Sequence, residues 1–275
     1  MDPTELAVDP DHIEQKQRDL AEAKSIVVGD APKMEQPDDG KVSLTFGLLN
    51  GDDYETEAEV RELNGADEEA LAKFTNMVDL ADAILSRAVV RIGSVVLSDL
   101  PPSERQTTLG PLLAGDRELL FLGIIATTYG DKREVPFVCP HCEMQNEVDV
   151  IISEDFKPEV KEPIKPTYEF TTSKGEVIVY RLANGFDQLS LSRKKGLTVA
   201  QANSSILHDC ILSVDGMPPF SPMEFVLNMG MKDRRELLAR MEDAQPGVDM
   251  GLSLNCPNCG EDVKLLVSWE DIFRL

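Results

Sequence analysis

Four of the five cysteines stand in two short motifs, and they are the residues of this chain best suited to chemistry. The motifs read Cys139-Pro-His-Cys142 and Cys256-Pro-Asn-Cys259. A Cys-x-x-Cys turn can place both sulfurs on one side of a small loop, and the proline restricts φ there. Four thiolates are the ligand set of a closed tetrahedral zinc site. We therefore predict one zinc ion held by the two motifs together, with the ligands Cys139, Cys142, Cys256 and Cys259.

A closed four-thiolate site leaves no position for an activated water, so the prediction is a structural role. Two metal-free turns are one alternative. A redox disulfide within a single motif is another, but it requires a βαβ context that the sequence does not show. His141 cannot easily reach the same ion as both neighbouring thiolates, so we expect it to support the site or to lie on the surface. Cys210 stands in an apolar run and is expected to be a buried thiol.

The two motifs close two similar stretches of sequence. Arg61–Asp67 and Arg181–Asp187 share an arginine, an Asn-Gly pair and an aspartate at the same spacing. Asp116-Arg117 precedes Cys139 by 23 residues, and Asp233-Arg234 precedes Cys256 by 23 residues. We predict a duplicated α+β fold of two pseudo-repeated subdomains. Each would contain a β-hairpin, helices and a zinc knuckle, and the shared four-cysteine zinc site would join them.

Local patterns predict the elements that position these motifs. Alternating apolar residues over 42–48 and the Asn50-Gly51 turn indicate a hairpin that returns to about residue 63. A helical period then runs from Asp67 to Leu85. The second half repeats this order, with a hairpin over 168–182 and a helix after Asn184-Gly185. We expect Asp116 to cap a helix, and Asp233 to begin another with a capping box. The alternative role of these repeated Asp-Arg pairs is a contact with a partner.

Composition divides the chain further. Residues 1–40 are acidic and interrupted by prolines, so they are predicted to be an extended arm. This arm is either a disordered tail or a segment that orders against a neighbouring subunit. The first repeat is predicted over 41–152 and the second over 167–275. A linker rich in Pro, Lys and Glu covers 153–166.

The net charge of −23 limits the partners of this chain. Such a surface repels phosphate backbones and anionic membranes at long range. The sequence shows no secretory signal and no apolar run near the ~20 residues that a membrane span requires. Cysteines used in this way fit a reducing cytoplasm. We expect neither nucleic acid nor membrane among the partners.

Catalytic motifs are not found in the sequence. It has no Gly-rich phosphate loop, no GxSxG and no HExxH. Its three histidines, His12, His141 and His208, stand in no catalytic context. We therefore expect a protein without enzymatic activity and without catalytic residues.

Several motifs together resemble a known family. They are the repeated Asn-Gly-x-Asp, the stretch Ile125–Gly130 (IATTYG) leading into the first CPxC, and Pro246–Asp249 (PGVD) before the second. This order resembles the T4-type tailed-phage baseplate hub proteins over about residues 41–275. The resemblance implies the same four cysteines as ligands. Its first knuckle typically ends in CPxCG, whereas Glu143 stands here in place of the glycine.

The resemblance implies a non-enzymatic component of the phage tail or baseplate, synthesised in the host cytoplasm. Our leading hypothesis is a zinc-stabilised structural protein of the virion, in a tail hub or baseplate. It would bind other tail proteins through its acidic surface, could form a ring with copies of itself, and could dock its N-terminal arm on a neighbour. One alternative is an assembly chaperone that is not retained in the virion. Another is a zinc-ribbon nucleic-acid-binding protein, which the net charge opposes.

Overall fold

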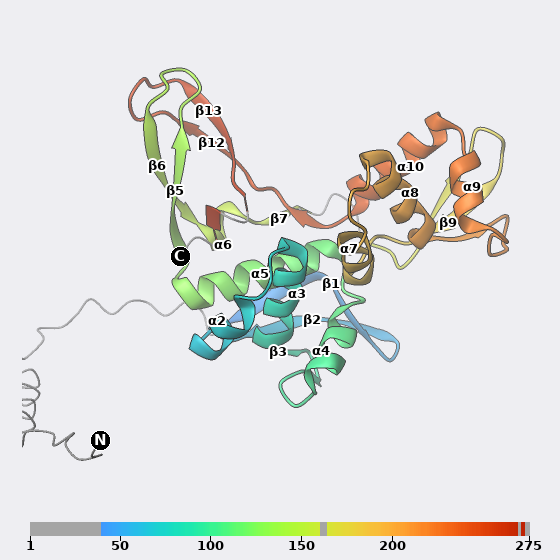
Figure 1. Ribbon diagram of the computed structural model, residues 1–275, viewed down its shortest axis with the longest axis horizontal. Coiled ribbons are helices and arrows are strands. Elements are labelled where there is room, and N and C mark those ends of the chain that lie inside the picture. The colour runs from blue at the N-terminus through green and yellow to red at the C-terminus, as the bar shows by residue number, and fades with distance from the viewer. Residues whose placement is uncertain (1–39, 160–163, 269–270, 273–275) are drawn as a thin grey trace, which may run out of the picture. The chain divides into compact units, whose positions relative to one another are not determined.

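The structure, a computed structural model, describes residues 40–159, 164–268 and 271–272. The described chain combines helices with small antiparallel sheets (Figure 1), which confirms the predicted α+β class. Except for Gly40, the predicted N-terminal arm lies outside the described residues, as does part of the predicted linker.

The first half begins with a four-stranded antiparallel sheet in the order β1-β2-β3-β4. Its helices α3 and α5 contact one another, and α5 also contacts β1 and β2. A hairpin of β5 and β6 follows α5 and is paired over its full length. The elements are β1 (Lys41–Asn50), β2 (Asp53–Val60), α2 (Gly65–Leu71), α3 (Met77–Ala88), β3 (Val89–Ile92), β4 (Val95–Val96), α4 (Pro102–Leu109), α5 (Ala114–Tyr129), β5 (Lys132–Val138) and β6 (Gln145–Ile151).

A short connection leads into the second half through α6 (Ile152–Asp155) and β7 (Pro158–Glu159). The second half begins with a three-stranded sheet in the order β10-β9-β8 and ends with the hairpin of β12 and β13. Its elements are β8 (Tyr168–Thr171), β9 (Val177–Tyr180), α7 (Gly185–Ser192), α8 (Val199–Cys210), β10 (Ile211–Val214), α9 (Pro222–Asn228), α10 (Met231–Ala244), β11 (Gly247–Val248), β12 (Gly251–Asn255) and β13 (Asp262–Leu266).

Both halves follow the same order of main elements, a hairpin, two helices, a strand, two helices and a final hairpin, with the short strand β4 added in the first half and β11 in the second. Local bonds agree as well. Asn64 caps α2 and Asn184 caps α7, each in a capping box with the aspartate three residues later. Those aspartates also pair with an arginine six residues before them, at 2.7 Å for Arg61–Asp67 and 2.5 Å for Arg181–Asp187.

Each half has a main apolar core. The first surrounds α3 and α5 and contains the fully buried Ile84, Leu120 and Ile124. The second surrounds α8 and α10 and includes Leu207 and Leu237. The C-terminal residues Val267 and Ile272 are buried in the first core, not in the second. The strand β11 pairs with β7 and also contacts α5 of the first half.

The predicted capping roles of Asp116 and Asp233 are wrong. Helix α5 begins at Ala114, and α10 begins at Met231, so both aspartates lie inside the first turn. Asp116 accepts hydrogen bonds from the backbone N–H groups of Thr45 and Gly47, at 2.6 and 2.7 Å. These donors stand where β1 loses its regular register with β2. The carboxylate therefore pairs strand N–H groups that the sheet leaves without a partner.

Asp233 occupies the matching place in the second half. It accepts hydrogen bonds from the backbone N–H and the hydroxyl of Ser173, at 3.0 and 2.6 Å, in the turn between β8 and β9. The hydrogen bonds from Ser173 lower the pKa of the Asp233 carboxyl. The repeated aspartate thus joins the long helix of each half to its first hairpin.

Three further differences concern the helices. The period from Asp67 to Leu85 belongs to two helices, α2 and α3, because Asn76 caps a new helix start. The short helices α4 and α9 were not predicted, because α4 has a single large apolar residue, Leu109, and α9 is only seven residues long, too short to show a helical period. One helix is predicted from Val199 to Leu212, but α8 ends at Cys210 and Ile211 begins a strand. Cys210 is fully buried, as predicted, and burial raises the pKa of its thiol to about 12.

Candidate metal centre

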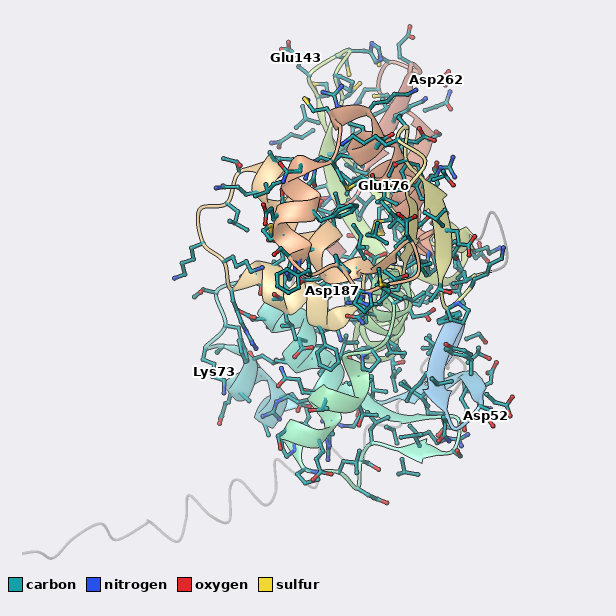
Figure 2. The ribbon with its side chains drawn as sticks, turned by 90° about the vertical axis from the view of Figure 1, so that its right-hand side faces the viewer. Asp52, Lys73, Glu143, Glu176, Asp187 and Asp262 are labelled. Atoms are coloured by element: carbon teal, nitrogen blue, oxygen red, sulfur yellow. The ribbon has the colours of Figure 1, made fainter. Side chains whose placement is uncertain are left out.

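Two β-hairpins carry the four cysteines of the motifs at their tips. Strand β5 runs into Cys139 and β6 leaves the first knuckle, while β12 runs into Cys256 and β13 leaves the second. Figure 1 shows the two hairpins side by side, and Glu143 and Asp262 lie at their ends in Figure 2. The pairing of each hairpin fixes where its knuckle begins and ends.

The two knuckles have the same backbone hydrogen bonds. The N–H of Glu143 donates to the carbonyl of Cys139 at 2.9 Å, and that of Gly260 donates to Cys256 at 2.8 Å. The residue after the second cysteine has positive φ in both, 58° at Glu143 and 78° at Gly260. Glycine adopts this conformation freely, whereas glutamate does so at a cost. The replacement of glycine by Glu143 therefore leaves the turn intact.

The four sulfur atoms come together from the two hairpins. All four lie within 4.8 Å of one another. The Sγ atoms of Cys139 and Cys259 are 3.8 Å apart, as are those of Cys142 and Cys256. A tetrahedron with zinc–sulfur bonds of about 2.3 Å has sulfur–sulfur edges of about 3.8 Å, whereas a disulfide bond is about 2.05 Å. The cluster thus has the size of a four-thiolate metal site.

A small apolar layer and one side-chain amide support this cluster. Cys139 and Cys256 are buried together with Phe137 and Val263, one residue from each hairpin. The side-chain amide of Asn146 lies 3.9 Å from the sulfur of Cys256, across the two hairpins. Sequence reasoning missed Asn146, since nothing in its local context separates it from other strand residues.

His141 contributes no ring nitrogen to the cluster. Its Nε2 lies 3.3 Å from the carbonyl oxygen of Asp262 in the other hairpin, and its backbone N–H points to the sulfur of Cys139 at 3.4 Å. The imidazole is exposed. This agrees with the supporting or surface position expected for it.

The sulfur atoms differ in how easily they lose a proton. The backbone N–H of Cys259, with that of Asn258, lowers the pKa of Cys256 to about 6. The N–H of Glu261 lowers the pKa of Cys259, but burial and the neighbouring sulfurs outweigh it and raise this pKa to about 12. The negative charge of a first thiolate therefore makes ionisation of the next thiol less favourable, because like charges repel at this distance. A cation bound among the sulfurs removes that repulsion and favours four thiolates.

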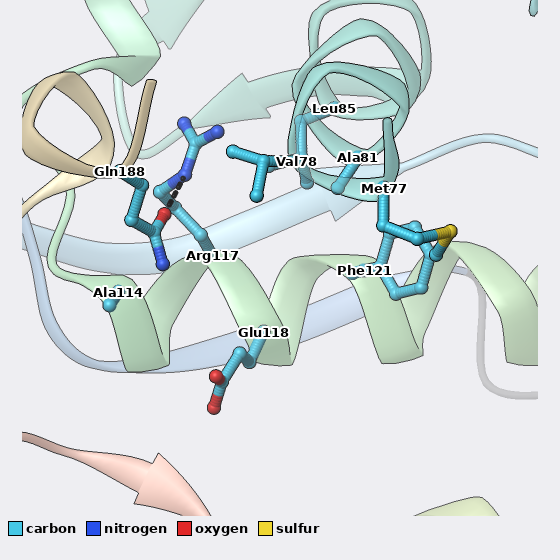
Figure 3. Close-up of a pocket in the computed structure, with 9 residues that line it drawn as sticks. All are labelled: Met77, Val78, Ala81, Leu85, Ala114, Arg117, Glu118, Phe121 and Gln188. Carbon is cyan, nitrogen blue, oxygen red and sulfur yellow. Dashed lines mark hydrogen bonds between the residues drawn. The ribbon is translucent and has the colours of Figure 1, made fainter. Parts of the chain in front are cut away.

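The described residues also line cavities, including one of about 530 Å³ beside the start of α2 whose lining is mostly apolar apart from Asn64, Glu68 and Thr128. A cavity of about 160 Å³ lies between α3, α5 and α7 (Figure 3). Small-molecule sites usually measure about 300–1,000 Å³, so this cavity is small for a substrate. Its lining is mostly apolar, apart from Arg117, Glu118 and Gln188. The four-cysteine cluster remains the arrangement with the clearest chemistry.

A comparison of the sequence with known families gives one match. The family described as T4 bacteriophage base plate protein matches residues 52–274, which include both knuckles. This chain belongs to that family. Neither the curated proteins nor the solved structures gave a match. The family is one of structural phage proteins, so the chain is a baseplate component of the phage tail that contacts other tail proteins.

Every helix in the described parts of the chain is too short or too polar to cross a membrane.

Proposed function

We propose that this chain is a zinc-stabilised structural protein of a tailed-phage baseplate or tail hub, without enzymatic activity. The observation that carries the proposal is the cluster of four sulfurs, two from the end of each half, at the spacing of a tetrahedral metal site. Zinc is the ion proposed because it favours four thiolates in this geometry. Membership of the baseplate family supports the structural role.

Zinc would act on the fold and not on a substrate. A two-stranded hairpin is marginally stable alone, and each knuckle here stands on one such hairpin. One ion shared by both would hold the hairpins together and add its binding free energy to folding. The shared ion would link Cys139 and Cys142 of the first half to Cys256 and Cys259 of the second half.

Neighbouring tail proteins are the proposed partners. The net charge of −23 favours partner surfaces that carry basic residues. The N-terminal arm is proposed to dock on a neighbour, and copies of the chain are proposed to assemble with one another. Nucleic acid is not proposed as a partner, because a strongly acidic chain is repelled by phosphate.

Analysis of purified particles tests this role. We expect the chain in tails and whole virions at a fixed ratio to other baseplate proteins. Its presence only in assembly intermediates would contradict the proposal and favour an assembly chaperone. Strong salt-dependent binding of the purified chain to DNA or RNA would instead favour the zinc-ribbon nucleic-acid binder.

A further inference from the structure

The first half of the chain is covered by the start of α7 from the second half. The backbone N–H of Gly185 donates to the carbonyl of Leu112 at 3.1 Å, and that of Phe186 donates to Gly110 at 3.2 Å. In α7 the Oε1 of Gln188 accepts a hydrogen bond from Nε of Arg117 at 3.2 Å (Figure 3). The start of one Asn-Gly-x-Asp helix is thus seated on the loop before α5.

Close packing at this contact depends on two glycines. A Cβ atom on Gly110 would lie 2.2 Å from the ring of Phe186. A Cβ atom on Gly185 would lie 2.6 Å from Nη1 of Arg117. Side chains at either position would push the helix away, so both glycines are explained by this contact.

The surface of the first half on which the start of α7 lies has an equivalent in the second half. We call this surface the receiving surface. Arg117 donates to the carbonyl of Leu109, eight residues earlier, and to Asp82 in α3. Arg234 donates to the carbonyl of Val226, also eight residues earlier, and to a side chain of α8. The two arginines therefore occupy equivalent places, and residues near them can be paired by position.

This pairing places three exposed apolar residues on the receiving surface of the second half. Val199 corresponds to Met77 at the start of α3, and Met77 lines the cavity shown in Figure 3. Leu227 and Met231 correspond to Gly110 and Ala114 in the first half. The exposed fractions of Val199, Leu227 and Met231 are 79%, 65% and 69%. Exposed apolar side chains gathered at one place mark a surface for a partner.

The first half has the complementary element uncovered. Helix α2 starts with the same Asn-Gly pair as α7, and its Gly65 and Ala66 are exposed. Among the described residues, no atom beyond its chain neighbours and its own helix backbone lies within 4 Å of where a Cβ of Gly65 would stand. Its φ is not positive either, so nothing within the described chain requires glycine at this position. A requirement would arise if an arginine of another molecule lay against it, as Arg117 lies against Gly185.

The sizes of the facing side chains also fit. Within the chain, the large Phe186 meets Gly110, which has no side chain. Between molecules, the small Ala66 would meet the large Leu227. In the first pair the bulky side chain belongs to the helix start, and in the second it belongs to the surface that the helix contacts. The two pairs therefore fill a similar space.

Charges complete the match. Glu68 stands in α2 at the place of Gln188 in α7, so it would meet Arg234 as Gln188 meets Arg117. Glu69 beside it is exposed, and the receiving surface carries the exposed Lys232 and Arg235 at the start of α10. An acidic helix start would thus face a basic patch in a chain that is otherwise strongly acidic.

We propose that the exposed surface of α9 and α10 binds the start of α2 from a second copy of this chain. The contact repeats between molecules the one that joins the two halves within each molecule. It is head-to-tail, so it produces a closed ring or an open chain of subunits. The inference rests on the proposed role as an assembling baseplate protein, but it uses none of the cysteines.

Sedimentation of the full-length chain tests this contact with two variants. Leu227→Asp alters the receiving surface, and Gly65→Arg alters the helix start without entering a strained backbone. We expect the wild-type chain to associate beyond a dimer as its concentration rises to about 0.1 mM, where micromolar contacts are nearly saturated. Each variant alone should be monomeric. An equimolar mixture of the two should form a dimer, because one intact surface of each kind remains.

Controls separate this contact from general damage. Leu266→Asp changes an apolar side chain of similar exposure, 78%, elsewhere on the molecule, and should associate like the wild type. Glu68→Lys provides a second helix-start variant and should also weaken association. A monomeric wild-type chain, or variants that associate normally, would overturn the inference. Either result would leave the occurrence of the chain in virions as a separate measurement, so the two proposals can fail independently.

Discussion

The two halves of this chain share a scaffold but differ in how they surround the same arginine. In the first half, Arg117 is buried and pairs with the buried Asp82 at 2.8 Å, under the cover of α7. In the second half, Arg234 bonds the neutral Ser204 and is more accessible. The comparison shows that the surface around Arg117 is covered within the molecule by α7, whereas the equivalent surface around Arg234 is exposed.

The strongest way to disturb both halves together is to remove one ligand. Cys256→Ser belongs to the second half, yet a shared ion would also hold the β5–β6 hairpin. Loss of a structural zinc site can remove about 10 kcal/mol of binding free energy. We expect hydrogen exchange to accelerate in both hairpins. Faster exchange confined to β12 and β13 would show that each knuckle acts alone.

Paired substitutions test whether the two arginines differ in how much they stabilise the fold. Arg117→Met leaves the buried carboxylate of Asp82 without its charge partner, which should cost about 3–5 kcal/mol of unfolding free energy. Arg234→Met removes hydrogen bonds to Val226 and Ser204 and should cost about 1–2 kcal/mol. Urea unfolding measures both. Equal costs would contradict the difference in burial, and Asp82→Leu added to Arg117→Met should recover part of the loss.

Acid should weaken the ion pair that begins α2. A hydrogen bond from Arg61 lowers the pKa of Asp67 from 3.8 to about 2, against the effect of burial. Because the folded pKa is the lower one, this stability is complete above pH 4 and is lost as the pH falls toward 2. Arg61 and Arg87 are 37% and 39% exposed, so about 1 kcal/mol is expected after screening.

The difference in unfolding free energy between wild type and Asp67→Asn isolates this effect, since acid release of any metal is common to both. We expect that difference to shrink between pH 4 and pH 2. A constant difference would mean that the ionised carboxylate adds no stability.

The two knuckles provide the smallest and sharpest comparison. Glu143 has the same left-handed backbone as Gly260, so Glu143→Gly should relieve strain and raise the unfolding free energy by about 0.5–1 kcal/mol. The reverse change, Gly260→Glu, should lower it by about 1 kcal/mol. Thermal unfolding with metal present can compare them. A loss of stability in Glu143→Gly would show that the glutamate side chain contributes more than its backbone costs.

Repetition made much of this fold predictable. The motif spacing indicated two related halves and brought four cysteines into one hypothesis, and the structure places their sulfurs together. The Asn-Gly-x-Asp pattern located the starts of α2 and α7 because capping chemistry is local. The exact limits of the predicted domains remain a prediction, and Val267 and Ile272 pack in the core of the first half.

What the sequence did not reveal depends on contacts between distant segments. The repeated Asp116 and Asp233 were visible, but their role depends on N–H groups in hairpins about 60–70 residues away. The contact between α7 and the loop at Gly110 depends equally on tertiary structure. Local patterns carry no information about which distant backbone groups lack partners, so helix capping was the simpler interpretation.

One zinc ion is proposed to join the two halves. Elemental analysis of the full-length chain, purified without chelator, tests it most directly, with the fourfold Cys→Ser variant at positions 139, 142, 256 and 259 as control. We expect one zinc per chain in the wild type and none in the variant. Wild-type protein without metal, or two ions per chain, would contradict a single shared site.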